Sequence, residues 1–346
     1  MTTGFVVGKF YPPHRGHKHL IDTARAQVDH LIVMICHHAS QDIPGELRAA
    51  WLREIHPDCD VRLVPDELDD DSQQWADFTL AYLGVAPDVV FSSEAYGPRF
   101  AALMGSRHVM VDQPRSAVPI SATKIRAAPL DHLAMLEPCV RAWYVRRVVI
   151  IGAESTGKTT LTLALAEHFA TSCVLEYGRE HWERKVAGLP MPGSSTADDA
   201  AASPLPGWSD DEFVHIAAEQ QRREELAARA ADRVLFCDTN AFATGTWYER
   251  YRGGRHPAVD AIGARDRVHL YLLTAPDVPF VQDGFRDGEH IREWMHQRFL
   301  TQLEAAAAAP GAAGTPYVLL DGPHSGRWPR AVAAVAAIAR LLGTRA

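Results

Sequence analysis

The sequence predicts an α/β protein made of two doubly wound parallel-sheet domains. Apolar runs of strand length alternate with helix-forming segments along the chain, as in parallel sheets covered by helices. A glycine-rich turn near the middle of the chain lies between one such run and a helix-forming segment. The length of 346 residues is sufficient for two domains, each with its own core. We expect domains at 1–145 and 146–346, with ligands beyond the carboxyl ends of the strands.

The first half contains five strand-like runs, expected at 4–10, 31–36, 61–64, 88–91 and 108–111. Apolar residues at helical spacing predict helices at 18–28, 44–55 and 72–83, and a loop enters a further helix at 120–126. We expect a helix at 133–144 to bridge the two domains.

The second half begins with the apolar run 148–151. Further strands are expected at 173–176, 233–238, 268–273 and 317–320, and helices at 178–186, 210–229, 289–308 and 329–342. The segment 189–208 is rich in Pro, Gly, Ser, Ala and Asp and shows no periodicity. We interpret it as a mobile surface insertion that is poorly ordered without a ligand.

The composition argues against several classes of protein. A net charge of -8 disfavours a general nucleic-acid binder. Five cysteines without a C-x-x-C pair indicate reduced thiols in a cytoplasmic protein. No apolar run approaches the roughly 18 residues of a membrane span, and the expected strand near residue 4 leaves no room for a signal peptide.

The middle turn matches the phosphate-binding P-loop, G-x-x-x-x-G-K-T, in full. Gly152 and Gly157 allow the backbone to wrap a phosphate, so that N–H groups and a helix N-terminus face the anion. Lys158 can then reach the β- and γ-phosphates of a nucleoside triphosphate, and the Thr159 hydroxyl can hold Mg²⁺. The other residues expected to bind the nucleotide here are Glu154, Ser155, Thr156 and Thr160.

A second nucleotide site is indicated by two motifs in the first half. His14-Arg15-Gly16-His17 is an H-x-G-H sequence, whose imidazoles can donate hydrogen bonds to a reacting α-phosphate. Gly16 permits close approach of a nucleotide to the backbone. The motif I-S-x-T-x-x-R at 120–126 places hydroxyls at a helix start and a cation one turn later, which suits the leaving pyrophosphate.

The segments GKFYPPHRGH, ISATKIR and GAESTGKTT together resemble the bifunctional NMN adenylyltransferase/nicotinamide riboside kinase family of the NadR type. The likeness extends over nearly the whole chain, with further echoes at 176–180, 237–239 and 283–286. It implies an HxGH nucleotidyltransferase domain that converts NMN to NAD, followed by a P-loop kinase domain that converts nicotinamide riboside to NMN. Some members also carry an N-terminal helix-turn-helix domain and repress transcription. Because the first strand is expected near residue 4, we expect no such domain or function.

In the transferase half, the phosphate of NMN attacks the α-phosphate of ATP, so positioning and charge stabilisation suffice without a general base. We expect His14 and His17 to act on the transition state. Ser121, Thr123 and Arg126 are expected to hold the pyrophosphate. The end of the first strand adds Gly8, Lys9 and Phe10, although Lys9 could equally be a solvated lysine. Trp75 is a candidate to stack on nicotinamide, with core packing as the alternative.

In the kinase half, a ribose hydroxyl benefits from a carboxylate that takes its proton. Asp238 is either the Mg²⁺ carboxylate or this base, and Glu176 either the base or a ligand of the ribose; structural carboxylates remain the alternative for both. Tyr177 and Arg179 are further substrate candidates, and Arg179 could instead pair with Glu180. The cations expected to close over the phosphates are Arg286 and Arg292, unless they are surface arginines.

The expected ligands are ATP at two sites, nicotinamide riboside, NMN and Mg²⁺, with no nucleic acid and no membrane. The alternatives are the same two folds acting on another nucleoside or phosphate, or a P-loop half that only senses nucleotide. The intact H-x-G-H and Lys158-Thr159 pairs argue against a pure sensor. A homo-oligomer is possible on the sequence, which leaves open the oligomeric state and the preference between amidated and acid pyridines.

Overall fold

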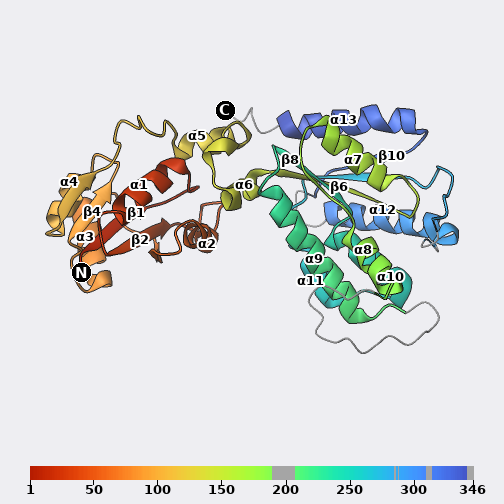
Figure 1. Ribbon diagram of the computed structural model, residues 1–346, viewed down its shortest axis with the longest axis horizontal. Coiled ribbons are helices and arrows are strands. Elements are labelled where there is room, and N and C mark those ends of the chain that lie inside the picture. The colour runs from red at the N-terminus through yellow and green to blue at the C-terminus, as the bar shows by residue number, and fades with distance from the viewer. Residues whose placement is uncertain (189–206, 284–285, 287, 309–313, 341–346) are drawn as a thin grey trace. The chain divides into compact units, whose positions relative to one another are not determined.

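The computed structural model describes the chain except for residues 189–206, 284–285, 287, 309–313 and 341–346. The chain forms two compact units, one spanning Met1–Trp143 and the other beginning at Tyr144. Each unit contains a five-stranded sheet in which the paired strands run parallel, with helices on both faces (Figure 1). The predicted fold class is therefore confirmed.

The first unit contains, in chain order, β1 (Thr3–Gly8), α1 (Arg15–Arg25), β2 (His30–His37), α2 (Gly45–Ile55), β3 (Asp60–Pro65), α3 (Ser72–Leu83), β4 (Val89–Ser92), α4 (Gly97–Leu103), β5 (Arg107–Met110), α5 (Ala122–Ala127), two 3₁₀ turns (Pro129–Asp131 and Leu133–Met135) and α6 (Pro138–Tyr144). The strand order is β3-β2-β1-β4-β5. The winding reverses between β1 and β4, which opens a crevice at their carboxyl ends.

Both faces of the first sheet are buried. Successive strand residues point to opposite faces, so Val6 packs with α1 and α2 whereas Phe5 packs with α3 and α4. This explains why the strands appear in the sequence as continuous apolar runs.

The second unit contains β6 (Arg146–Gly152), α7 (Lys158–His168), β7 (Cys173–Val174), α8 (Tyr177–Val186), α9 (Asp210–Ala228), β8 (Val234–Asp238), α10 (Ala241–Arg252), α11 (Pro257–Gly263), β9 (Leu270–Thr274), a 3₁₀ turn (Glu289–Ile291), α12 (Arg292–Ala308), β10 (Tyr317–Leu320) and α13 (His324–Arg340). The strand order is β10-β9-β6-β8-β7. Helices α7 and α13 cover one face, and α9 and α12 contact the other (Figure 1). The turn after β6 therefore lies at the middle of the carboxyl edge.

Several local predictions differ from the structure. The helix expected at 133–144 is a 3₁₀ turn followed by α6, because Pro138 cannot continue a helix from the residue before it. The strand expected at 173–176 ends at Val174, which leaves Glu176 outside the sheet. Helices α4, α10 and α11 had no sequence prediction.

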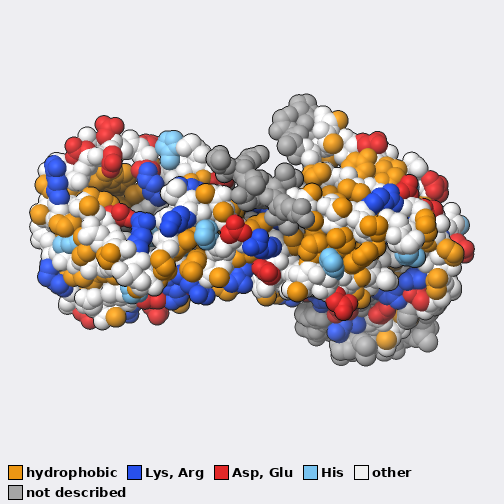
Figure 2. Space-filling view, turned by 90° about the horizontal axis from the view of Figure 1, so that it is seen from above, with side chains coloured by type: hydrophobic (Ala, Val, Ile, Leu, Met, Phe, Trp, Pro, Cys, Tyr) orange, Lys and Arg blue, Asp and Glu red, His pale blue; other side chains and the backbone are white. Residues whose placement is uncertain are grey.

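On the face shown in Figure 2, basic and acidic side chains are interspersed over both units. None of the helices that the structure describes combines the length and hydropathy needed to cross a bilayer.

Candidate active sites

The H-x-G-H turn forms the start of α1. His14 is its N-cap residue, and Nδ1 of its ring accepts the N–H groups of Gly16 at 3.1 Å and His17 at 3.3 Å. Nδ1 is therefore unprotonated, and Nε2–H is the one donor that a neutral His14 can offer to a phosphate. A Cβ at position 16 would approach the His14 ring to 3.0 Å, so the turn requires glycine there.

Both histidines of the motif are neutral near pH 7. Their rings stack at 3.7 Å. Burial, aided by the nearby charge of Arg115, lowers the pKa of His14 to about 4. Burial, the neighbouring His14 and Arg115 together hold the pKa of His17 well below its usual value. The two rings can therefore donate hydrogen bonds, but the positive charge at this site must come from elsewhere.

Arg115 supplies such a charge and was missed by the sequence analysis. It lies in the loop between β5 and α5, and its Nη2 is 2.9 Å from Oε1 of Glu94. Asp112 shapes this loop by accepting the N–H groups of Ser116 and Ala117 at 2.7 and 3.0 Å. The signal available in the sequence was a cation in the loop just before the I-S-x-T-x-x-R motif.

The structure brings that motif to the H-x-G-H turn. Ser121 caps α5 by accepting the Lys124 N–H at 3.3 Å. Arg126 donates to the carbonyl oxygen of Tyr11 at 2.5 Å and to the Thr123 hydroxyl at 3.4 Å. Its guanidinium carbon lies 4.7 Å from the centre of the Tyr11 ring. Two motifs far apart in sequence thus share one site.

A cavity of about 620 Å³ opens beside this turn, at the crevice between β1 and β4. Five predicted site residues line it: Gly8, Lys9, Phe10, His17 and Trp75. Lys9 pairs with Asp66 at 2.7 Å but keeps 64% of its side chain exposed. Trp75 also packs against the core through an edge contact with Phe78, while stacking on nicotinamide stays a prediction.

The P-loop of the second unit is preformed. Gly152 has φ of 150°, and a Cβ there would lie 2.7 Å from the carbonyl oxygen of Thr274. Gly157 has φ of 85°, in the left-handed region that favours glycine. Lys158 is buried at the first turn of α7 and donates to the carbonyl oxygen of Ala153 at 2.9 Å. The loop therefore has its phosphate-binding shape with the lysine folded against it.

Asp238, at the end of β8, is bound to the P-loop. The Thr159 hydroxyl donates to its Oδ2 at 2.5 Å, while its buried Oδ1 has no hydrogen-bond partner among the described residues. A hydroxyl and a carboxylate oxygen are hard donors that suit Mg²⁺ together with nucleotide phosphates. The described residues contain no group of three or more His, Cys, Asp or Glu side chains that could hold a metal alone.

Glu176 is arranged differently from Asp238. It occupies the N-cap position of α8, makes no side-chain capping bond and lines the cavity beside the P-loop. Enclosure by protein atoms raises the pKa of its carboxyl to about 7, with Lys158 lowering it and Asp238 raising it. Glu176 therefore has the properties of a proton acceptor near neutral pH.

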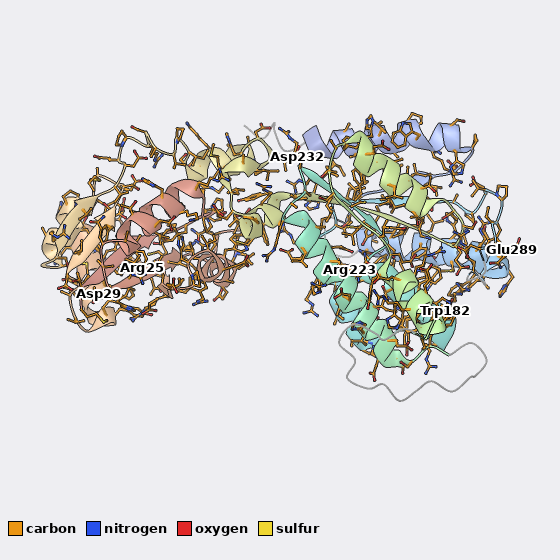
Figure 3. All side chains as sticks on the ribbon, viewed as in Figure 1. Arg25, Asp29, Trp182, Arg223, Asp232 and Glu289 are labelled. Carbon is orange, nitrogen blue, oxygen red and sulfur yellow. The ribbon has the colours of Figure 1, made fainter. Side chains whose placement is uncertain are left out.

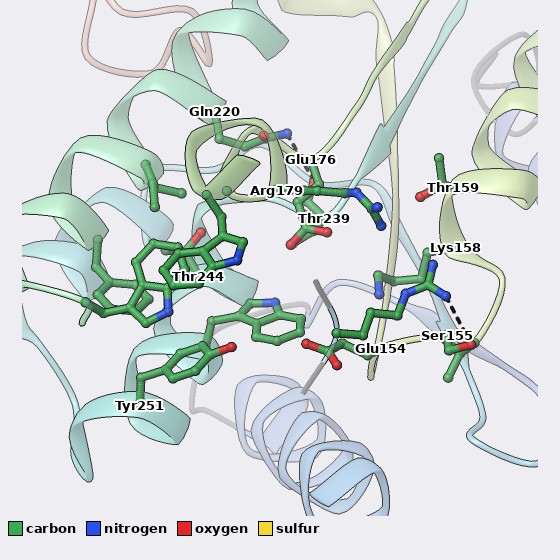
Figure 4. Close-up of a pocket in the computed structure, with 18 of the residues that line it drawn as sticks. Glu154, Ser155, Lys158, Thr159, Glu176, Arg179, Gln220, Thr239, Thr244 and Tyr251 are labelled. Atoms are coloured by element: carbon green, nitrogen blue, oxygen red, sulfur yellow. Dashed lines mark hydrogen bonds between the residues drawn. The ribbon is translucent and has the colours of Figure 1, made fainter. Parts of the chain in front are cut away.

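The cavity beside the P-loop has a volume of about 390 Å³ and an aromatic end (Figure 4). Figure 3 shows Trp182 on α8, and this ring stacks on Trp208 with centroids 4.8 Å apart. The remaining aromatic residues of this end are Phe213, Trp247 and Tyr251. Trp247 and Tyr251 are four residues apart on α10, a spacing that could have revealed them.

Trp208 corrects the sequence analysis. The segment 189–208 was expected to be a mobile insertion, but Trp208 packs against Phe213 and Tyr251 at 5.2 and 5.6 Å. Contacts between large aromatic rings hold Trp208 against α9 and α10. The remainder of the predicted insertion, 189–206, lies outside the described residues.

The other predicted residues of this site divide into two groups. Those that line the cavity are Glu154, Ser155, Thr156, Gly157, Lys158, Thr159, Thr160, Glu176, Arg179 and Arg286. Arg179 pairs with Glu183 and Asp283, both at 2.7 Å. The second group has structural contacts. Arg292 is buried and donates to carbonyl oxygens of Val278 and Ser155, and Tyr177 is 1% exposed with its hydroxyl 3.0 Å from His215.

Geometry and sequence together define the class of protein: a nucleotidyltransferase-type domain followed by a P-loop domain. Residues 5–128 match the cytidylyltransferase-like family, and residues 147–327, more than half of the chain, match the AAA domain family. The chain belongs to the AAA domain family, whose model matches its second half. Relatives and solved structures also agree with the resemblance seen in the sequence.

Two relatives carry the name trifunctional NAD biosynthesis/regulator protein NadR. The protein of Escherichia coli K12 is 29% identical over 330 residues, covering 87% of this chain and 76% of the relative. That of Salmonella typhimurium LT2 is 29% identical over 328 residues, covering 87% and 75%.

Two solved structures have the same fold. One is a NadR protein in complex with NR, with a TM-score of 0.75 and 21% identity. The other is a NadR protein in complex with NAD and AMP-PNP, with a TM-score of 0.69 and 20% identity. Each covers 98% of this chain and 96% of the compared chain.

Proposed function

We propose that this chain is a bifunctional NAD salvage enzyme. Its second half phosphorylates nicotinamide riboside with ATP, and its first half joins the resulting NMN to the adenylyl group of another ATP, releasing pyrophosphate. The observation that carries this proposal is the presence in one chain of two turns with phosphate-binding motifs, each beside its own cavity. Similarity to the NadR relatives, and the ligands named for the two solved NadR structures, support the same substrates.

In the kinase half, the hydrogen bond between Thr159 and Asp238 favours Asp238 as the carboxylate of the metal site. Mg²⁺ held there with the nucleotide would neutralise charge on the β- and γ-phosphates. Glu176 then takes the proton of the ribose 5′-hydroxyl as the oxygen attacks the γ-phosphorus and ADP leaves. Lys158 turns from the Ala153 carbonyl to the phosphates.

The aromatic end of this cavity suits the pyridinium ring of nicotinamide riboside. Trp182, Trp247 and Tyr251 line this end of the cavity, where aromatic faces attract a flat cation. The same cavity also contains the cations Lys158, Arg179 and Arg286, so the aromatic rings, and not the net charge, are the basis for this assignment.

In the transferase half, an oxygen of the NMN phosphate attacks the α-phosphorus of ATP and the bond to pyrophosphate breaks. His14 and His17 donate hydrogen bonds as neutral rings, while Arg115 and Arg126 supply positive charge. No side chain needs to remove a proton, because the attacking phosphate is already ionised. Trp75 lines this cavity and would stack on the nicotinamide.

The test is product analysis after incubation of the protein with nicotinamide riboside, ATP and Mg²⁺. We expect NAD, ADP and pyrophosphate, with NMN as an intermediate. Release of ADP that does not depend on the riboside would contradict the substrate assignment and would instead indicate a nucleotide sensor.

A further inference from the structure

Gln220 lies on α9, and its side-chain amide bonds to the two segments that follow β7 and β8. It is 2% exposed and lines the kinase cavity. Its Oε1 accepts the backbone N–H of Tyr177 at 2.9 Å. Its Nε2 donates to Glu224 Oε1 at 3.2 Å and to the carbonyl oxygen of Thr239 at 3.5 Å, the second of which is drawn in Figure 4. One amide thus fixes the chain after β7 to the chain after β8.

Tyr177 directly follows Glu176, so the hydrogen bond between Gln220 and Tyr177 lies beside the proposed proton acceptor. Tyr177 is the first residue of α8, and the first N–H groups of a helix have no partner within it. Glu176 stands at the N-cap position, where a side chain can accept the N–H of the second or third helical residue, yet it makes no such bond. The Gln220 amide binds the first N–H, and the Glu176 carboxylate lines the cavity.

We propose that Gln220 is a positioning residue for the proton acceptor Glu176. This inference rests on the proposed kinase function and adds a residue that acts through Glu176 without accepting the proton itself. Loss of the amide would leave the Tyr177 N–H unpaired and free the first turn of α8 to shift, so that the Glu176 carboxylate could accept the N–H groups of the next helical residues.

The three partners of Gln220 determine which way its amide points. The Tyr177 N–H requires an oxygen, whereas the Thr239 carbonyl requires an N–H donor. Glu224, 1% exposed, accepts the second N–H. Glutamate at position 220 could keep the bond to Tyr177 but would lose the N–H that Gln220 donates to the Thr239 carbonyl oxygen. The contacts on α8 and those on β8 can therefore be separated by mutation.

An ion pair provides a second link between α8 and α9 that does not involve Gln220. Arg223, one turn further along α9 (Figure 3), lies 2.6 Å from Oε2 of Glu180 on α8. A Gln220 variant should therefore retain the packing of α8 on α9 and alter mainly the start of α8.

The readout is the pH dependence of riboside phosphorylation. The groups that act on Glu176 are Lys158 and Arg179, which favour its ionised form, and Asp238 and Glu154, which disfavour it. A hydrogen bond from the helix end to the carboxylate would favour the ionised form further. In Gln220→Leu, the acidic limb of the kcat profile should consequently move to lower pH.

The experiment compares Gln220→Leu, Gln220→Glu and Gln221→Leu in the full chain between about pH 5 and pH 9. Gln221 is a matched control: it is the next residue of α9, bonds to the Ile262 carbonyl and Asp266 at 3.2 and 2.8 Å, and does not line the cavity. Conversion of NMN to NAD by the same molecules shows that the other half of the chain is folded.

For Gln220→Leu we expect kcat to fall about 10- to 100-fold, with the KM for ATP unchanged and the acidic limb at lower pH. Gln220→Glu, which retains an acceptor for Tyr177, should not move the limb to lower pH, and Gln221→Leu should keep the wild-type profile. An unmoved limb in Gln220→Leu, or one that moves equally in Gln221→Leu, would overturn the positioning role. Absence of riboside phosphorylation in the wild type would instead contradict the proposed function.

Discussion

Burial lowers the pKa of His14 to about 4 in the first unit and raises the pKa of Glu176 to about 7 in the second. The cause is the same in both, because a site enclosed by protein disfavours the charged form of any group. The consequences differ with the nucleophile. A phosphate needs only neutral hydrogen-bond donors and fixed cations, whereas a hydroxyl needs a group that can accept its proton near pH 7. The same desolvation thus suits His14 to donate a hydrogen bond as a neutral ring and suits Glu176 to accept a proton near pH 7.

Replacing the proton acceptor should produce the largest effect. Glu176→Gln keeps the size of the side chain but removes its basicity, so kcat for riboside phosphorylation should fall about 10²- to 10⁴-fold. Asp238→Asn should instead increase the Mg²⁺ concentration needed for half-maximal rate, since this carboxylate contacts Thr159. Magnesium titrations of both variants would check the comparison. Equal shifts in the magnesium requirement would contradict separate roles.

Removing one donor from the transferase site should have the next largest effect. In His17→Ala, adenylyl transfer should slow about 10²- to 10³-fold, or about 3–4 kcal/mol in activation free energy, and NMN should accumulate. Lys158→Ala should show the converse, losing riboside phosphorylation but still converting supplied NMN to NAD.

Mixing these two variants should restore the whole reaction, because free NMN can diffuse between molecules. Chromatography of the products would follow both halves at once. Loss of riboside phosphorylation in His17→Ala, in protein shown to be folded by circular dichroism, would mean that the sites are not independent.

The aromatic end distinguishes the kinase cavity from the transferase cavity and should affect binding more than chemistry. Trp247→Leu should raise the KM for nicotinamide riboside about 10- to 30-fold with little change in kcat, reflecting a lost cation–π contact of about 2 kcal/mol. Trp294→Leu is the matched control, because Trp294 is 43% exposed on α12 and does not line the cavity. Steady-state kinetics would decide, and equal effects of the two substitutions would argue against ring stacking.

The smallest predicted effect is the pH dependence of the unmodified protein. The raised pKa of Glu176 means that the base is protonated below about pH 7, so riboside kcat should rise up to about tenfold from pH 6 to pH 8. His14 and His17 remain neutral throughout this range, so their titration should not change the rate of adenylyl transfer. The phosphate of NMN titrates near pH 6, so the comparison is best made between about pH 7 and pH 8. A steeper rise for adenylyl transfer than for phosphorylation would contradict it.

The sequence alone determined both phosphate-binding turns and the class of fold. Gly152, Gly157 and Lys158 act within one short turn, and Gly16 is needed because of its own neighbour His14, so the motif contains the whole physical requirement. The alternation of buried strands and helices is equally local, since side-chain periodicity reflects which faces are covered.

Only the tertiary structure distinguished the expected roles of Asp238 and Glu176. The contacts between Thr159 and Asp238 and between Tyr177 and Gln220 join residues that are 79 and 43 positions apart. Neither partner carries a local signal of the other, because a hydrogen bond across a sheet edge depends on strand order and not on sequence spacing. The pKa shifts of His14 and Glu176 also could not be predicted from the sequence, because desolvation depends on every element packed around a group. The tertiary structure therefore makes Asp238 a candidate for the metal site and Glu176 a candidate proton acceptor.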